Sequence, residues 1–183
     1  MKNFYSKIFE EISHILKQTD IVALEKIAKS LISINKKNKK VIIFGNGGSA
    51  AISSHVSIDL TKNARIRSIN FNEADLLTCF SNDYGYEKVY SKSLEFYADR
   101  GDVVIIISSS GKSKNVLEAA KICKKKKILL YTLTGFSKSN PLKKMGNINL
   151  WVNSKAYNII ENIHQIWLLS IVDRIIGKTE YSA

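Results

Sequence analysis

Two short segments rich in glycine and serine offer groups that suit the binding of an anion. The first is GNGGS at residues 45–49 and the second is ISSSGKS at residues 107–113, each at the end of an apolar run. Glycines let backbone N–H groups approach a ligand closely, and serine hydroxyls donate hydrogen bonds with little bulk. The first segment does not have the spacing of a dinucleotide or nucleoside triphosphate motif. The two segments therefore predict a phosphate site, with plain strand-to-helix turns as the alternative.

A histidine and an aspartate lie four residues apart just after the first segment. His55 and Asp59 fall in a predicted helix, where such residues differ by about 40° around the axis and share one face. They could bind a metal ion or transfer a proton. A solvated surface pair is the alternative, but the neighbouring anion-binding segment favours the functional interpretation.

Strands and helices alternate from residue 41 onward. Short β-branched or apolar runs predict strands at 41–44, 68–71, 103–108, 128–134 and 148–152. Helices are expected at 49–63, 87–99, 113–126 and 159–176, with a short turn of helix at 142–145 and an undecided segment at 73–82. Strands separated by helices of about ten residues or more indicate a parallel sheet with both faces covered. We expect the α/β fold class, as a doubly wound three-layer α/β/α sandwich.

The first 35 residues carry two further helices outside the sheet unit. Apolar residues recur with a helical period at 3–17, and Asp20 is placed to cap a second helix that ends near residue 34. Their apolar stripes need a partner, which indicates contacts between subunits. With 183 residues, of which 45% are hydrophobic, residues 1–183 are expected to form a single domain.

The net charge of +12 invites a nucleic-acid interpretation. The lysines gather in KKNKK at 36–40 and KKKK at 124–127, where predicted helices end and cations are favoured. No nucleic-acid motif accompanies them, so we expect a solvated surface whose field favours a phosphorylated small substrate.

Apolar stretches too short for a membrane span and a polar start without a signal-peptide core predict a cytoplasmic protein. Cys79 and Cys123 lack CxxC spacing and are expected to be buried thiols.

The two anion-binding segments, together with SNDYGY at 81–86 and LTG at 133–135, resemble the SIS sugar-isomerase domain. The resemblance covers nearly the whole chain and is most similar to the sedoheptulose-7-phosphate isomerases, or phosphoheptose isomerases. It implies a sugar-phosphate pocket in an SIS fold. The residues that it implies around the phosphate are Ser49, Ser108, Ser109, Ser110 and Ser113, and those along the rest of the pocket are Asn46, Gly47, Gly48, Asn82 and Asp83.

The resemblance also implies a metal centre, which is altered in this chain. In the family, the positions of His55 and Asp59 hold a histidine and a glutamate that bind metal, and the glutamate is the proposed base. We therefore expect Asp59 to be the base. Zn²⁺ is expected to be held by His55, Asp59 and Glu161, whose side chains suit an open zinc site.

The last predicted helix departs further from the family pattern Q-E-x-H-x-x-x-x-H. Glu161 replaces the glutamine, and Leu169 replaces the second histidine, which is a metal ligand and proposed acid. His164 could supply the missing acid, and so could another subunit or metal-bound water. A buried core or interface histidine is the alternative for His164.

These residues imply an aldose-ketose isomerase that converts sedoheptulose 7-phosphate to D-glycero-D-manno-heptose 7-phosphate for lipopolysaccharide synthesis, through an enediol. The family also implies a homotetramer with active sites between subunits. The alternative is a non-catalytic SIS protein, either a phosphosugar sensor or an assembly factor of the type that binds the replication initiator. Leu169 favours that alternative, whereas His55, Asp59 and the serines favour the enzyme. An isomerase with a shifted substrate is a third possibility.

Overall fold

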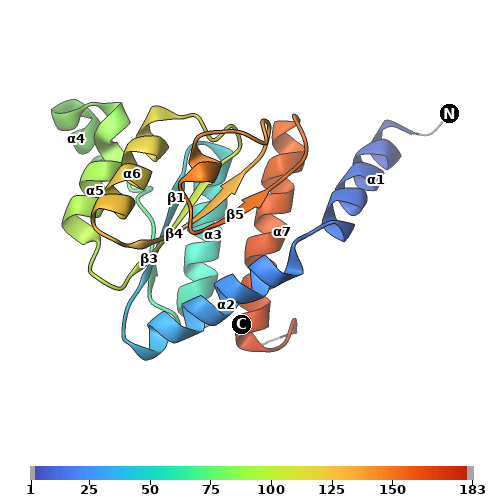
Figure 1. Cartoon of the computed structure of the whole chain (residues 1–183), viewed down its shortest axis with the longest axis horizontal. Coiled ribbons are helices and arrows are strands. Elements are labelled where there is room, and N and C mark those ends of the chain that lie inside the picture. Colours follow the sequence, from blue (N-terminus) through green and yellow to red (C-terminus); the bar gives the residue numbers. More distant parts are fainter. Residues whose placement is uncertain (1–2, 181–183) are drawn as a thin grey trace.

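Five parallel strands form the central sheet, in the order β2-β1-β3-β4-β5, and helices cover both of its faces (Figure 1). The computed structural model describes residues 3–180. The strands are β1 (Val41–Gly45), β2 (Ser68–Ile69), β3 (Val103–Ser108), β4 (Leu129–Thr134) and β5 (Ile148–Trp151). The helices are α1 (Phe4–Lys17), α2 (Ile21–Lys36), α3 (Gly48–Lys62), α4 (Ala74–Tyr84), α5 (Val89–Tyr97), α6 (Lys114–Lys125) and α7 (Tyr157–Ile176), with 3-10 turns η1 (Tyr86–Lys88) and η2 (Leu142–Lys144). The predicted three-layer α/β/α sandwich is confirmed.

The sequence of β3 explains why helices cover both faces. Every residue of β3 is buried, and alternate side chains enter two different apolar clusters. Val103, Ile105 and Ile107 pack with residues of α2, α3 and α7. Val104 and Ile106 pack with residues of α5 and α6. A strand buried on both faces needs apolar residues on both, as residues 103–107 are, and only its last residue, Ser108, is polar.

The strand order reverses at β1 and β3. The chain runs from β1 outward to β2 and then crosses to the other side of β1, where β3 pairs with it. Gly45 at the end of β1 lies opposite Ile107 near the end of β3. The following helices diverge, because α3 packs on one face of the sheet and α6 on the other. Doubly wound sheets bind ligands at such a reversal, beyond the carboxyl ends of the strands.

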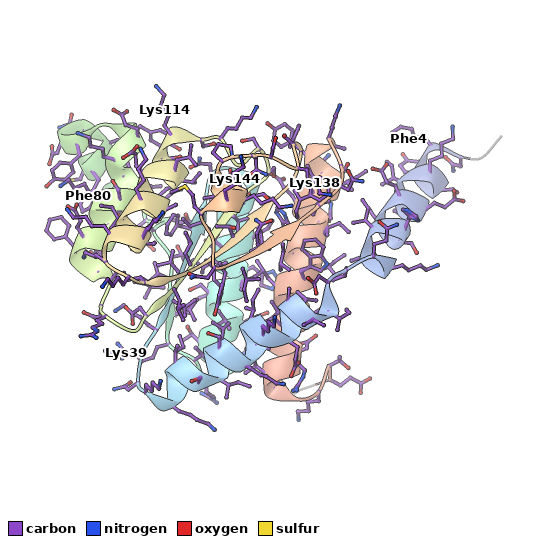
Figure 2. The ribbon with its side chains drawn as sticks, in the orientation of Figure 1. Phe4, Lys39, Phe80, Lys114, Lys138 and Lys144 are labelled. Atoms are coloured by element: carbon purple, nitrogen blue, oxygen red, sulfur yellow. The ribbon has the colours of Figure 1, made fainter. Side chains whose placement is uncertain are left out.

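The first helix stands apart from this sandwich (Figure 1). Ile15 is the buried residue of α1, whereas Phe4 and Phe9 are 70% and 66% exposed. Figure 2 shows Phe4 on the part of α1 that lies far from the sheet. The apolar face of α1 is therefore largely uncovered in a single copy of the chain.

Some sequence predictions need correction. The strand predicted at 68–71 is reduced to the two residues of β2, and the undecided segment at 73–82 lies largely in α4. Cys123 is buried as predicted, but Cys79 is exposed, because α4 buries none of its residues. Among the described helices, none combines the length and apolar character that crossing a membrane requires.

Candidate active site

A cavity of about 280 Å³ opens where β1 and β3 end. Its lining residues are Asn46, Gly47, Gly48, Ser49, Ser108, Ser109, Ser110, Ser113, Tyr157 and Glu161. The first eight come from the two Gly/Ser-rich segments, and the last two come from the start of α7. The fold thus brings together segments that are far apart in the sequence.

Three helices begin at this cavity. Their N-cap residues are Gly47 for α3, Ser113 for α6 and Ala156 for α7, and none of these three makes a side-chain capping hydrogen bond. The first N–H groups of a helix have no partner within the helix, and the helix dipole adds partial positive charge there. Three such ends around one small cavity favour a bound anion such as phosphate.

The first segment is fixed by a glycine and an asparagine. Gly47 has a φ of 55°, in the left-handed region that glycine tolerates best. The Asn46 and Asn115 amides exchange hydrogen bonds of 3.0 and 2.9 Å. Asn46 Oδ1 also accepts hydrogen bonds from the hydroxyls of Tyr86 and Tyr90, each at 3.2 Å. These contacts hold the backbone at the start of α3 in place.

The second segment presents serine hydroxyls from a rigid loop. Ser108 Oγ accepts a hydrogen bond of 3.2 Å from the Gly111 N–H. Gly111 has a φ of 62° and lies directly against the Asn140 side chain, where a larger residue would overlap it. Ser109 Oγ is buried and has no hydrogen-bond partner among the described residues. A buried hydroxyl without a partner is costly, so a ligand or a water molecule is expected to bind it.

The carboxylate of Glu161 covers the first residue of α3. It lies so close to Gly48 that a side chain at that position would overlap it. Burial raises the pKa of Glu161. In the protonated form this carboxyl can donate a hydrogen bond to a phosphate oxygen, whereas the ionised form repels phosphate.

His55 and Asp59 form a pair farther along α3. His55 Nε2 lies 3.4 Å from Asp59 Oδ2, and the two side chains are 49% and 18% exposed. Gln165 Nε2 on α7 lies 3.3 Å from His55 Nδ1, and Asn63 Nδ2 donates a hydrogen bond of 3.1 Å to Asp59 Oδ1. Two amides therefore flank the pair, one on each side. His55 and Asp59 do not line the cavity, because they lie two and three turns beyond Gly48.

Known proteins are similar to this chain in sequence and in fold. Residues 3–135 match the family described as SIS domain. This chain belongs to the SIS domain family. It is 33% identical over 185 residues to the phosphoheptose isomerase of Sulfurimonas denitrificans, an alignment that covers 97% of this chain and 94% of that protein. A second relative, the phosphoheptose isomerase of Fusobacterium nucleatum, is 33% identical over 156 residues, or 82% of this chain and 80% of that one.

The fold of this SIS domain is also that of a solved phosphoheptose isomerase. The structure of GmhA from Neisseria gonorrhoeae matches it with a TM-score of 0.86 and 25% sequence identity, over 93% of this chain and 94% of that one. The resemblance that the two Gly/Ser-rich segments indicate is therefore confirmed.

The expected zinc ligands are not brought together within one SIS domain. Glu161 lies at Gly48, whereas His55 and Asp59 lie farther along α3. Among residues 3–180, no three His, Cys, Asp or Glu side chains are grouped so that they could hold a metal ion. The two ring nitrogens of His55 also face different partners, Gln165 and Asp59. The donor set of a single chain thus does not fit zinc, which requires three protein ligands in an open catalytic site.

His164 does not face the cavity, so it cannot supply the missing acid there. Its side chain is fully buried, and Nε2 lies 3.2 Å from the carbonyl oxygen of Thr134 at the end of β4. Burial lowers the pKa of His164 to about 4, so the ring is neutral at pH 7. His164 is therefore a core histidine, the alternative given above, although its Nδ1 has no hydrogen-bond partner among the described residues. Leu169 is partly buried against the same core and cannot replace the missing histidine.

Two further predicted residues lie outside the cavity, and one lining residue was missed. Asn82 and Asp83 are exposed in the last turn of α4, where Asn82 donates a hydrogen bond of 2.9 Å to Asp83. They are not part of the cavity lining, and from this part of the chain it is Tyr86, in the next turn, that contacts Asn46. Tyr157 lines the cavity but carries no motif. Its place at the start of the helix that follows the last strand was the available signal.

Proposed function

We propose that this SIS domain is a phosphosugar aldose-ketose isomerase that converts sedoheptulose 7-phosphate to D-glycero-D-manno-heptose 7-phosphate. The observation that carries the proposal is the cavity, where three uncapped helix starts surround the serines of two loops. The relatives that share most of the chain are phosphoheptose isomerases, which gives the sugar.

The distance between the cavity and the His55–Asp59 pair suits an extended sugar phosphate. His55 and Asp59 are seven and eleven residues after Gly48, which is about 10 Å and about 16 Å along an α-helix. The Asp59 side chain reaches back toward His55, because its Oδ2 lies 3.4 Å from His55 Nε2. With the phosphate group at the loops, the chain of a seven-carbon sugar extends toward the pair on α3. The proposal therefore assigns the two ends of the substrate to two parts of one helix.

Asp59 is the base in this proposal. Its carboxylate takes a proton from C1 of the ketose and returns it to C2, while a second proton moves from O1 to O2 through the enediol. His55 and Asn63 hold the two carboxylate oxygens through their contacts with Asp59. His164 is excluded as the acid by its burial, which leaves a group of another subunit or water.

A non-catalytic sugar-phosphate sensor or assembly factor is the second candidate. Leu169 and the dispersed donor set favour it, because neither feature is expected of the family's metal-dependent centre. Both candidates require sugar-phosphate binding, and only the isomerase requires Asp59 to abstract a proton.

Solvent exchange separates the two candidates. The purified protein is incubated with sedoheptulose 7-phosphate in deuterated water, with and without added Zn²⁺, and deuterium at C1 and C2 is measured by NMR. We expect exchange with the wild type and a loss of about 100-fold or more in Asp59→Asn, which keeps the shape of the side chain but removes the base. Asp75→Asn on the exposed α4 is the matched control. Binding without exchange in the wild type would favour the sensor.

The assembly, metal and cellular role belong to the same proposal. The exposed apolar side chains of α1 support a homotetramer, and a monomer at micromolar concentration in light scattering would contradict it. Zinc is part of this proposal only if a second subunit supplies a further ligand beside His55 and Asp59. A cytoplasmic location and a role in lipopolysaccharide synthesis follow from the proposed reaction.

A further inference from the structure

The aromatic ring of Tyr157 gives the cavity a feature that phosphate binding does not require. Among the described residues that line the cavity, Tyr157 is the one aromatic side chain, and the others are glycines, serines, Asn46 and Glu161. The side chain is 58% exposed although it lines the cavity, so it lies at the opening and not at the base. It is the first residue of α7, one turn before Glu161.

The Tyr157 ring is supported from the end of β4. It packs against the Phe136 ring, with centroids 4.8 Å apart and planes inclined at 59°. Phe136 has a φ of 50°, which is uncommon for a bulky residue, and its N–H donates a hydrogen bond of 3.0 Å to the Ser154 carbonyl. A non-glycine residue keeps such a conformation when its surroundings fix it, and such residues cluster at functional sites.

The segment that supports the ring is also joined to the serine loop. The Gly135 N–H donates a hydrogen bond of 2.8 Å to the carbonyl of Ser109. A side chain at Gly135 would overlap Ile160 of α7, so β4, α7 and the serine loop meet closely here. The position of the Tyr157 ring is therefore fixed relative to the donors that we assign to the phosphate.

We propose that Tyr157 is a substrate-positioning residue, whose ring packs against the carbon chain of the sugar next to the phosphate. This inference rests on the proposed function for the identity of the sugar phosphate. The apolar face of a tyrosine suits the C–H groups of a sugar, whereas the serines and amides suit its phosphate and hydroxyl groups. Tyr157 thus adds affinity for a sugar phosphate over inorganic phosphate and directs the chain away from the loops.

The test compares two probes, inorganic phosphate and sedoheptulose 7-phosphate, by calorimetry. In Tyr157→Ala we expect the affinity for sedoheptulose 7-phosphate to fall about tenfold, and that for inorganic phosphate to change less than about twofold. Tyr157→Phe keeps the ring and should stay within about threefold of the wild type for both probes. Phe136→Ala should reproduce part of the loss, because it removes the support of the ring.

Tyr84→Ala is the matched control, since Tyr84 is a partly exposed tyrosine on α4 outside the cavity. Thermal unfolding verifies that each variant folds, and Tyr157→Leu replaces Tyr157→Ala if the latter does not. The inference would be overturned if Tyr157→Ala or its replacement lost affinity equally for both probes, or lost affinity for neither. A Tyr157→Phe loss as large as that of Tyr157→Ala would overturn the assignment to the ring. Isomerisation by the wild type is scored separately, so failure of the proposed reaction is distinguishable from failure of this inference.

Discussion

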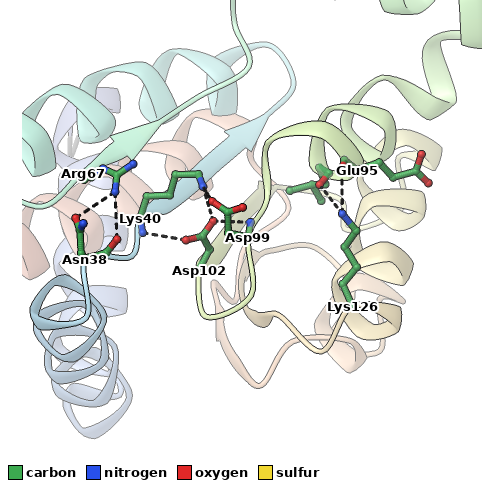
Figure 3. A network of polar contacts seen from close by, with 8 residues as sticks. Asn38, Lys40, Arg67, Glu95, Asp99, Asp102 and Lys126 are labelled. Atoms are coloured by element: carbon green, nitrogen blue, oxygen red, sulfur yellow. Dashed lines mark hydrogen bonds and ion pairs between the residues drawn. The ribbon is translucent and has the colours of Figure 1, made fainter.

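Polar groups cluster at both ends of β1 and β3, but the cluster around Lys40 at the amino ends is paired, whereas groups beyond the carboxyl ends lack partners. At the amino ends of β1 and β3, Lys40 Nζ lies 2.7 Å from a carboxylate oxygen of Asp102 and 2.7 Å from one of Asp99 (Figure 3). At the carboxyl ends, Ser109 Oγ has no partner among the described residues, and three helix starts lack side-chain caps. A saturated cluster stabilises the fold, and an unsaturated one is available for a ligand.

The buried polar groups of Lys40 and Asp102 all have hydrogen-bond or ion-pair partners. Asp102 Oδ1 accepts a hydrogen bond of 3.0 Å from the Lys40 N–H, and Asp102 Oδ2 accepts one of 2.9 Å from the Asp99 N–H. Burial lowers the pKa of Lys40, but hydrogen bonds to Asp102 and Asp99 outweigh it and raise the pKa overall. The cluster therefore joins two neighbouring strands with the charges paired.

The largest expected effect comes from breaking this cluster. Asp102 is 1% exposed, so Asp102→Ala leaves the buried Lys40 ammonium with only the Asp99 carboxylate, which is 71% exposed. Removing one partner of a buried pair costs about 3–5 kcal/mol in the free energy of unfolding, measured by urea denaturation. Asp99→Ala is the control and should cost much less, because the Asp99 carboxylate is largely solvated. An Asp102→Ala cost as small as that of Asp99→Ala would show that the cluster does not stabilise the fold.

Substitution at the other end should alter binding and not stability. Ser110 and Ser113 line the cavity, and Ser113 makes no capping bond to α6. Hydrogen bonds to a charged acceptor contribute about 1.5–3 kcal/mol each, so replacing both serines by alanine should weaken sedoheptulose 7-phosphate binding well over tenfold. The midpoint of urea unfolding should hardly change.

Ser137→Ala with Ser139→Ala is the control for this binding experiment, because these two exposed serines bond to each other outside the cavity. Unchanged calorimetric affinity in the Ser110 and Ser113 double variant would remove both residues from the phosphate site. A large loss of stability in the same variant would instead assign them to the fold, and the contrast between the two ends of the sheet would disappear.

The structural features that the sequence predicts correctly are those that a single strand or turn determines. The apolar run of β3 can be satisfied only by burial on both faces, and Gly47 with its neighbours requires a tight turn into a helix. The two Gly/Ser-rich segments were predicted to form one phosphate site, and they line the same cavity. Such features depend on local sequence and on simple rules of topology.

The side-chain positions that the sequence does not predict are those that depend on how one helix packs against its neighbours. Helical spacing alone did not reveal that His164 faces the core or that Glu161 contacts Gly48, because the rotation of α7 about its axis is set by α3 and β4. Asn82 and Asp83 lie on a helix that buries no residue, so their distance from the cavity depends on how α4 packs. Tyr157 has no motif and is recognised only after the helix starts are placed around the cavity.

The smallest expected effect concerns the His55–Asp59 pair. This pair is intermediate between the Lys40 cluster and the cavity, because its polar atoms have some partners and its side chains are partly exposed. Gln165 Nε2 lies 3.3 Å from His55 Nδ1, so the ring proton is placed on Nε2, which faces Asp59.

Gln165→Leu removes one neutral hydrogen bond, typically about 0.5–1.5 kcal/mol, and should lower kcat for isomerisation about two- to tenfold with little change in KM. The chain offers a matched control in Gln18→Leu, since Gln18 makes a similar contact of 3.0 Å with His14 and neither residue lines the cavity. A rise in KM without a change in kcat would mean that Gln165 contacts the sugar directly. An effect of Gln18→Leu equal to that of Gln165→Leu would mean that neither amide positions the catalytic pair.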